Sequence, residues 1–441
     1  MIKAVILIGG PLKGTRFRPL SFDTPKHLFP VGGRPMVQHL IEACAKVDGL
    51  KEIFLMGYYQ LDASLTTFIR NMSGEYNLDI RYLQEFTTLG TCGGIYHFRD
   101  IICRHNLEAF FLINGDVCGD FDLSAMLNFH RSIPNDTNGS MTVMVTEATR
   151  QQSLNYGCIV EAKDNHKILH FVEKPSTFVS TMINCGIYLC PITIFDQIAS
   201  VIKSKQDSNS SEAGERYADD YSDLDLTNKT MNGDLPEILS LEEDILSRLA
   251  GSHYLNAFHT NQWWCQVKTA ASAIYANRNY LKLYRGSHPS LLVNKTTTKG
   301  PEIIGDVWID PTAEVDSTAI IGPNVSIGSG VRVRAGVRIK ESIILSDALI
   351  GDHSLILHSI IGYNTVIGCW TRVEGTPSDP NPDKAFAKME NQTLFNQDGK
   401  LNPSITVLGS NVQVPSGLLV LNSIVLPHKE LGRSYRNEII L

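Results

Sequence analysis

The sequence lacks paired cysteines, long apolar runs and an excess of basic residues. Its nine cysteines are scattered singly without C-x-x-C spacing, which predicts reduced thiols in a cytoplasmic protein. No stretch approaches the roughly 20 apolar residues of a membrane span, and we expect no membrane association. The net charge of −7 disfavours a general nucleic-acid binder. We therefore expect the basic residues to serve a small phosphorylated ligand.

The length and composition predict a globular protein of two domains. A hydrophobic content of 43% and a charged content of 19% are typical of folded chains, and 441 residues exceed what one core usually holds. We place the first domain at residues 1–290 and the second at residues 296–441, because the periodicity of the sequence changes between them.

In the first domain, strand-like runs alternate with helical periodicity, which predicts an α/β fold with an open, mostly parallel sheet. From about 155 to 190 the runs follow one another without long helices, as in an antiparallel extension of the sheet. We interpret residues 205–235, rich in Ser, Asp, Glu and Asn, as a flexible acidic insert. The expected strands are Ala4–Ile8, Ile53–Tyr58, Ile80–Gln84, Ala109–Asn114, Met141–Thr146, Tyr156–Glu161, Ile168–Val172 and Ile183–Leu189.

The second domain shows an aliphatic residue at every sixth position, which indicates a parallel β-helix. We place a one-residue slip in this register between Leu345 and Ile350, and an inserted loop at about residues 374–404. The series in phase before the slip is Ile309, Val315, Ile321, Ile327, Val333, Ile339 and Leu345.

A glycine-rich, basic loop follows the first expected strand. Gly9 and Gly10 would let backbone N–H groups approach an anion, Arg16 offers a bidentate fork for phosphate oxygens, and Lys26 adds a mobile charge. The alternative is a solvated basic turn, since short glycine motifs are weak signals.

The whole combination is more specific. The stretch from Gly9 through Gly14-Thr15-Arg16 to Pro25-Lys26 resembles the N-terminal signature of the sugar-nucleotide pyrophosphorylases, which join a sugar 1-phosphate to a nucleoside triphosphate. The resemblance implies a Rossmann-like, GT-A-like nucleotidyltransferase domain followed by a left-handed β-helix. It also implies nucleotide binding by the two glycines and catalytic roles for Arg16, Lys26 and Asp116.

Three more motifs carry the resemblance. Asp116, after Asn114-Gly115, matches a ligand of Mg²⁺, although an Asp after a strand is often a turn residue. Gly90 and Thr91 match a segment that lies against the nucleobase. Glu85, just before them, is either a guanine reader, because one carboxylate can accept from guanine N1–H and N2–H together, or an exposed surface glutamate.

The remaining motif residues match sugar-binding positions of the family. Glu173 and Lys174, within Phe171–Pro175, correspond to a pair that binds sugar hydroxyls and phosphate. Gly157 and Asn184 match the other positions. Taken alone, Glu-Lys-Pro would be an ordinary surface turn, so the assignment depends on the order and spacing of all the motifs.

Within the family the chain is most similar to mannose-1-phosphate guanylyltransferases, and among them to alpha-type regulatory subunits, through residues 375–382 and 437–441. Two features depart from catalytic members. Pro11-Leu12-Lys13 lengthens the glycine loop by two residues, and Gln266 replaces the Asp that would be the second metal ligand. The resemblance therefore implies a weak Mg²⁺ site, with Asp116 its lone carboxylate.

We expect a regulatory subunit that binds GDP-mannose and mediates feedback inhibition of a catalytic beta-type subunit, in a homo-oligomer or larger complex. The first alternative is an active mannose-1-phosphate guanylyltransferase, converting GTP and mannose 1-phosphate to GDP-mannose and pyrophosphate. A second alternative is a structural scaffold with an empty pocket.

Overall fold

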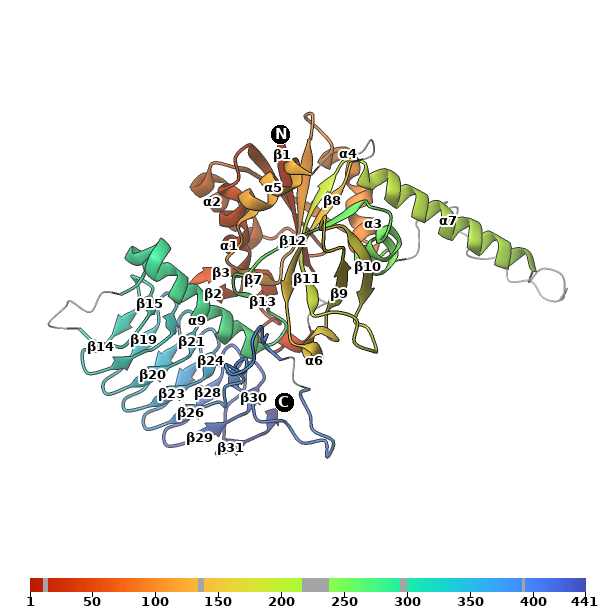
Figure 1. Ribbon diagram of the computed structural model, residues 1–441. Coiled ribbons are helices and arrows are strands. Elements are labelled where there is room, and N and C mark those ends of the chain that lie inside the picture. The colour runs from red at the N-terminus through yellow and green to blue at the C-terminus, as the bar shows by residue number, and fades with distance from the viewer. Residues whose placement is uncertain (11–14, 134–138, 216–237, 294–299, 391–392) are drawn as a thin grey trace, which may run out of the picture. The chain divides into compact units, whose positions relative to one another are not determined.

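The computed structural model describes residues 1–10, 15–133, 139–215, 238–293, 300–390 and 393–441 (Figure 1). The chain forms two compact units, and neither is continuous in sequence. The first unit comprises Met1–Gly9, Ala43–Asn114 and Asp122–Asn261; the second comprises Gly10–Glu42, Gly115–Phe121 and Gln262–Leu441. These borders differ from our division near residue 290, because short segments of the N-terminal region share a core with the C-terminal coils.

The first unit is built on a nine-stranded mixed sheet. Its strands are β1 (Ile2–Gly9), β4 (Leu50–Gly57), β5 (Asp79–Gln84), β6 (Ala109–Asn114), β8 (Met141–Glu147), β9 (Gly157–Glu161), β10 (Ile168–Glu173), β11 (Met182–Pro191) and β12 (Leu255–His259). β1 lies between β4 and β6, and β4 pairs with β5, all in parallel. β11 is antiparallel to β6, and β9 and β10 form an antiparallel hairpin. The predicted parallel centre and antiparallel extension are confirmed.

Buried aliphatic and aromatic side chains join helices to this sheet. Cys92 and Ile95 from α3 and Ile198 from α7 share a core with sheet residues such as Phe110 and Val143. The helices of this unit are α2 (Ala63–Tyr76), α3 (Gly90–His97), α4 (Arg99–Ile102), α5 (Leu123–Ser132), α6 (Arg150–Ser153), α7 (Ile194–Glu215) and α8 (Ser247–Leu249), the last after a π-helical turn at Leu241–Leu246.

Helix α7 corrects part of the predicted acidic insert. Residues 205–215, which we expected to be flexible, continue this helix (Figure 1). Their few apolar residues hid the helical periodicity, but the segment extends a helix whose first turns are anchored by buried Ile194 and Ile198. The rest of the predicted insert, residues 216–235, lies outside the described residues.

The second unit contains a β-helix of three parallel sheets, which fits the predicted left-handed β-helix. The first sheet is β14 (Glu302–Ile303), β17 (Ile320–Ile321), β20 (Arg338–Lys340), β23 (Leu355–Leu357), β26 (Arg372–Glu374), β29 (Leu419–Leu421) and β31 (Tyr435–Arg436). The second is β15 (Val307–Ile309), β18 (Val325–Ile327), β21 (Ile343–Ile344), β24 (Ser359–Ile361), β27 (Thr406–Leu408), β30 (Ile424–Val425) and β32 (Ile439–Ile440). The third is β16 (Glu314–Val315), β19 (Arg332–Val333), β22 (Leu349–Ile350), β25 (Val366–Ile367) and β28 (Gln413–Val414).

The register slip occurs one step earlier than predicted. Ile327 pairs with Ile344, and Ile344 belongs to the interior of the coils. Leu345 instead faces a different core, outside the coils, together with helix α9 (Ala270–Ser287). Both neighbours are apolar because both faces of the strand are covered at this point, so composition alone could not tell them apart.

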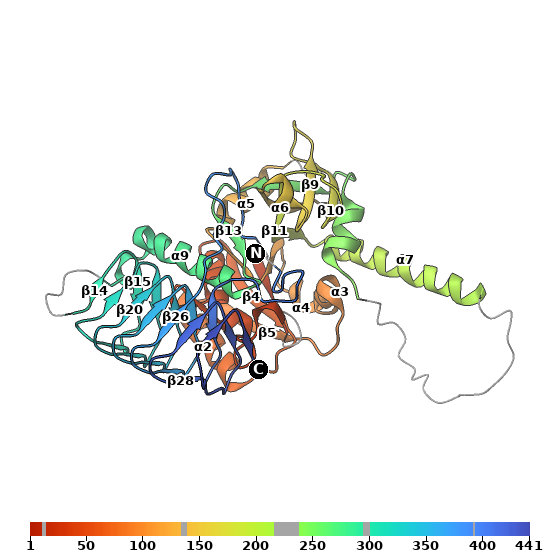
Figure 2. The same ribbon diagram turned by 90° about the horizontal axis from the view of Figure 1, so that it is seen from below.

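The outer core of the second unit joins N-terminal segments to the β-helix. It contains Phe17, Phe29 and Cys265 together with Tyr280 of α9 and Val407 of β27. Figures 1 and 2 show α9 running along the coils.

The other elements of this unit are two 3-10 turns (Thr15–Phe17 and Lys26–Leu28), β2 (Pro30–Val31), β3 (Arg34–Pro35), β7 (Val117–Gly119), β13 (Trp264–Gln266) and a 3-10 turn at Pro289–Leu291. Helix α1 (Met36–Ala45) contains the border between the units.

The segment between β26 and β27 interrupts the coils, as predicted for residues 374–404. Part of it packs on its own unit, since Met389 and Leu401 are buried and Asp379 bonds to Arg278 of α9 over 2.9 Å. Phe386 and Phe395 remain exposed. The segment therefore has both an anchored side and an exposed apolar side.

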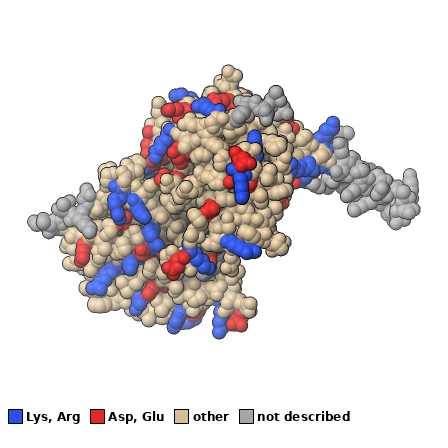
Figure 3. Space-filling view, viewed as in Figure 1, with Lys and Arg blue, Asp and Glu red and all other residues tan. Residues whose placement is uncertain are grey.

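Two surface properties bear on function. Acidic and basic side chains are interspersed over the face shown in Figure 3. Among the described residues, no helix is both long and apolar enough to cross a membrane.

Candidate functional site

The predicted nucleotide- and sugar-binding residues of the first unit lie at one edge of its sheet. Gly9 pairs with Gly57, and Gly57 with Gln84, so the carboxyl ends of β1, β4 and β5 align. Gly9 has a φ of +69°, a conformation that favours glycine, and its carbonyl accepts a hydrogen bond from Tyr58 N–H over 2.8 Å. Open α/β sheets bind their ligands beyond this edge.

Glu85 follows β5 directly and is held in place. A Cβ on Gly94 of α3 would overlap its carboxylate, so the glycine is required for their close approach. Burial raises the pKa of Tyr58, and the neighbouring Glu85 carboxylate raises it further. Glu85 is half-buried, which favours a specific role over that of an exposed surface glutamate.

Gly90 and Thr91 make contacts that sequence reasoning did not predict. Leu239 N–H donates to the Leu89 carbonyl over 2.9 Å, and Cys92 N–H donates to the Leu239 carbonyl over 3.0 Å. The Thr91 hydroxyl accepts from Leu241 N–H over 2.9 Å. A Cβ on Gly90 would overlap Leu239. These two residues therefore have a structural role as well as a predicted nucleotide-binding one.

The β9–β10 hairpin brings together the predicted sugar-phosphate residues. Gly157 pairs with Glu173, and a Cβ on Gly157 would lie 2.8 Å from Glu173 Oε2 and 2.7 Å from the Phe171 ring. Lys174 Nζ lies 2.8 Å from Glu173 Oε1, with its side chain 60% exposed. The glycine thus leaves room for a carboxylate at the edge, beside an ammonium that solvent or a ligand can reach.

Asn184 is held by Gly186 and by Tyr188, and the sequence did not mark Tyr188 for this role. Its Oδ1 accepts from Gly186 N–H over 2.9 Å, and its Nδ2 donates to the Tyr188 hydroxyl over 2.6 Å. That hydroxyl donates in turn to Glu242 Oε1 over 3.4 Å. Burial raises the pKa of Glu242, and the Glu173 carboxylate is a further cause. Tyr188 has the sequence pattern of a strand core residue, and Glu242 lies far away along the chain, so no local signal marked them.

The second unit contains the predicted catalytic lysine and aspartate. Lys26 Nζ donates to Asp116 Oδ2 over 3.0 Å, and Gln266 Nε2 donates to Asp116 Oδ1 over 2.9 Å. The antiparallel pairing of β7 with β13 places Gln266 opposite Val117. Burial alone would raise the pKa of Asp116, but Lys26, Gln266 and Lys268 outweigh it, and the pKa falls below its usual value.

This donor set fits Mg²⁺ poorly. Magnesium in nucleotide sites is usually held by one or two carboxylates and phosphate oxygens. Here Asp116 supplies one carboxylate, and each of its oxygens already accepts a hydrogen bond, one from an ammonium. Gln266 adds an amide without negative charge. We derive no chemical step through a metal at this position.

Arg16 belongs to the second unit as well. It is exposed in the turn Thr15–Phe17 and lines a cavity of about 460 Å³ together with Arg18, Phe22, Ser378, Glu390 and Leu394. The inserted segment therefore borders the predicted phosphate-binding arginine. Gly10 is buried, and Pro11-Leu12-Lys13, the lengthened part of the loop, lies outside the described residues.

Comparison with known proteins identifies the family of the chain. Residues 3–282 match the nucleotidyl transferase family, and residues 303–440 match the GMPPB C-terminal domain family. The chain is 54% identical to the mannose-1-phosphate guanylyltransferase regulatory subunit alpha of Drosophila melanogaster, with all of both chains covered. It is 53% identical to regulatory subunit alpha-B of Danio rerio and 52% identical to regulatory subunit alpha of Papio anubis, again over both full lengths.

The chain belongs to this family of alpha-type guanylyltransferase subunits. The predicted family and fold class are thereby confirmed. The first unit keeps Gly157 and Glu173 paired in the β9–β10 hairpin. In the second unit, both oxygens of Asp116 accept hydrogen bonds from Lys26 and Gln266.

Proposed function

We propose that this protein is a regulatory subunit that binds GDP-mannose and transmits feedback inhibition to a catalytic guanylyltransferase subunit. The observation that carries the proposal is the occupation of both Asp116 oxygens by Lys26 and Gln266, while the sugar-binding motifs are kept. A chain selected for binding needs the sugar and base contacts. A chain selected for transfer also needs charge neutralisation at the phosphates, which is where such enzymes gain their rate.

In this proposal Glu85 reads the guanine, and Glu173 and Lys174 bind the sugar and its phosphate. Gly157 keeps the space open and Asn184 contributes a fixed amide. Arg16 remains a predicted phosphate-binding residue. Binding should not require Mg²⁺, because these contacts are made by the protein's own side chains.

The rival function is slow guanylyl transfer by the same chain. Purified protein supplied with GTP, mannose 1-phosphate and Mg²⁺ separates the two, with pyrophosphate release as the readout. We expect release at background level together with calorimetric binding of GDP-mannose in the presence of EDTA. Turnover comparable with that of a catalytic relative would refute the regulatory assignment. Absence of GDP-mannose binding would favour a scaffold.

The partner follows from the same proposal. A regulatory chain needs a catalytic one, and we propose a beta-type guanylyltransferase subunit, with the flat parallel sheets and terminal coils of the β-helix as assembly surfaces. We also propose at least a homodimer, to be tested by light scattering of the isolated chain at micromolar concentration, where a monomer with and without the partner would contradict it. All nine cysteines are free thiols, which supports a cytoplasmic location.

A further inference from the structure

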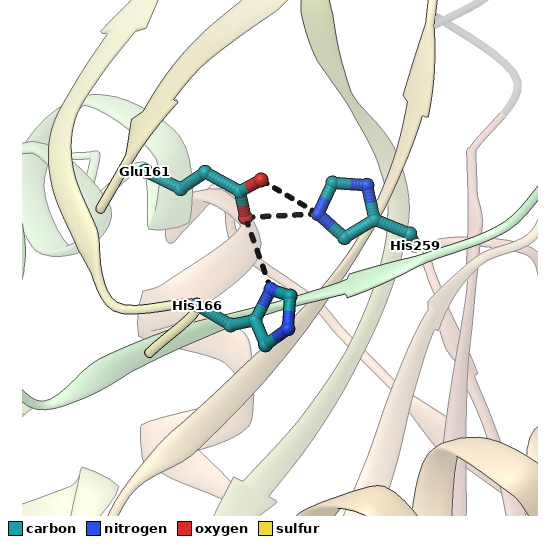
Figure 4. A group of neighbouring side chains, drawn as sticks. All are labelled: Glu161, His166 and His259. Atoms are coloured by element: carbon teal, nitrogen blue, oxygen red, sulfur yellow. Dashed lines mark hydrogen bonds and ion pairs between the residues drawn. The ribbon is translucent and has the colours of Figure 1, made fainter. Parts of the chain in front are cut away.

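Three side chains with metal-ligating atoms meet at the tip of the β9–β10 hairpin. Glu161 ends β9, His166 lies in the turn before β10, and His259 ends β12. Figure 4 shows the Glu161 carboxylate directed toward both imidazole rings. One ligand atom from each of the three residues lies within 4.8 Å of the other two, the one such group of three among the described residues.

The backbone holds these residues in place. The His166 carbonyl accepts from Ala257 N–H of β12 over 2.8 Å, and the Lys167 carbonyl accepts from Ala162 N–H over 2.8 Å. His166 has a φ of +56°, a left-handed conformation that reverses the chain at the turn. His259 is paired with Val145 in the sheet. The three side chains therefore project from a hydrogen-bonded frame, as a preorganised ligand set requires.

The three ligand atoms lie close enough together to reach one ion. His259 Nε2 lies 2.8 Å from both carboxylate oxygens of Glu161, which is a hydrogen bond. His166 Nδ1 lies 3.7 Å from Glu161 Oε2, too far for a hydrogen bond. Ligands bound at ~2.0–2.2 Å to one tetrahedral zinc ion stand about 3–3.5 Å apart, so small side-chain rotations would bring all three onto one ion.

We propose that Glu161, His166 and His259 form a binding site for a zinc ion. Two imidazoles and one carboxylate suit zinc, whereas Ca²⁺ and Mg²⁺ prefer oxygen ligands only. The side chains are 22%, 52% and 37% exposed, so water can complete the coordination. The site does not depend on the function proposed above.

The zinc ion would fix the hairpin to β12 across a long sequence separation. The hairpin that carries Glu161 at its tip carries Gly157 and Glu173 at its other end. A ligand that binds the folded chain but not the unfolded chain stabilises the fold. The gain in stability grows with the logarithm of the ligand concentration divided by Kd. Bound zinc thus stabilises the β9–β10 hairpin, which positions the sugar-binding residues.

The test uses the full-length chain, freed of any histidine tag and of metal, and titrated with zinc chloride by calorimetry. We expect one ion per chain, with at least tenfold weaker binding in His166→Asn and in His259→Asn. Zinc should raise the unfolding midpoint of the unmodified chain and lose this effect in both variants. His170→Asn is the matched control, because His170 is exposed on the same hairpin outside the cluster, and it should bind zinc normally.

A second variant separates metal binding from the ion pair. Glu161→Gln keeps a hydrogen-bond acceptor for His259 but removes the negative charge, so it should weaken zinc binding at least tenfold without lowering the midpoint of the metal-free chain by more than a few degrees. With Co²⁺ as the probe, the absorption spectrum should show nitrogen and oxygen ligation without a thiolate charge-transfer band. No binding by the unmodified chain, equal affinity in the histidine variants, or a thiolate band would overturn the proposal.

Discussion

Gln266 donates a hydrogen bond to Asp116 at the position where a second carboxylate would make a metal site. The Nε2–Oδ1 distance is 2.9 Å, and the other oxygen of Asp116 accepts from Lys26. The aspartate is therefore neutralised within the protein, by groups that need no ligand. This arrangement stabilises the folded chain. It also compensates the negative charge of Asp116, which would otherwise attract the cation that transfer chemistry requires.

Replacing Gln266 with Asp should restore little activity. The new carboxylate would stand beside Asp116 and lower the unfolding midpoint without metal, and added Mg²⁺ should partly reverse that loss in this variant only. Pyrophosphate release should stay far below that of a catalytic relative, since Pro11-Leu12-Lys13 still lengthens the glycine loop and Lys26 still occupies Asp116. Gln262→Asp, on the exposed neighbouring loop, should show no Mg²⁺ effect. Full activity in Gln266→Asp would contradict this account.

Gly157→Ala should weaken GDP-mannose binding by about 1–3 kcal/mol, because the added methyl group would crowd Glu173 and the Phe171 ring. Isothermal calorimetry gives the affinity. Gly74→Ala is the matched control: a methyl group there meets nothing within 4 Å, and in helix α2 it should leave affinity unchanged and raise stability by about 0.5–1 kcal/mol. Equal affinities for both variants would remove Gly157 from the site.

Tyr188→Phe should also weaken GDP-mannose binding, by about 1 kcal/mol, because Asn184 loses the hydroxyl that its Nδ2 contacts over 2.6 Å. The control is Tyr254→Phe, which removes a hydroxyl bonded to Thr193 over 3.0 Å. Both variants should lose some stability in urea unfolding, but only the first should lose affinity. If both lose affinity equally, the effect is general and the Asn184 assignment fails.

Lys174→Ala should weaken GDP-mannose binding by about 1.5–3 kcal/mol if its ammonium contacts the phosphate, and Glu173→Ala should weaken it through the sugar hydroxyls. Lys174 is the more exposed of the two, so its removal should cost little stability. Lys167→Ala, a lysine on the same hairpin bonded to the His253 carbonyl, provides the control. Affinity that does not change in either variant would count against the assigned sugar-phosphate position.

Deletion of residues 379–399 should abolish feedback in a mixed complex, measured as pyrophosphate release with rising GDP-mannose. The segment is anchored by the Asp379–Arg278 ion pair but exposes Phe386 and Phe395, large apolar groups that a partner subunit would cover. Trp370→Ser serves as control, since Trp370 is an exposed aromatic of the β-helix outside this segment. Inhibition that is unchanged by the deletion would show that the segment does not transmit feedback to the catalytic subunit.

Much of the fold was decided by local sequence. Ala109–Asn114 was predicted to its ends, and most other strands to within a few residues, because continuous apolar runs between turn residues have few alternatives in an α/β sheet. The six-residue period of the second domain likewise predicted the β-helix, because each short strand buries one aliphatic side chain. That Gln266 stands where catalytic members of the family carry an Asp is a prediction from the resemblance in sequence alone.

Other features were decided only by the tertiary structure. Ile344 and Leu345 are both apolar, and only packing assigned one to the interior of the coils and the other to α9. The bond between Lys26 and Asp116 joins residues 90 positions apart, which no spacing argument could have foreseen. The core that joins Phe17 and Phe29 to the β-helix also depends on contacts between residues far apart in sequence. Such contacts are set by where whole elements pack, and the residue pattern within each element does not determine them.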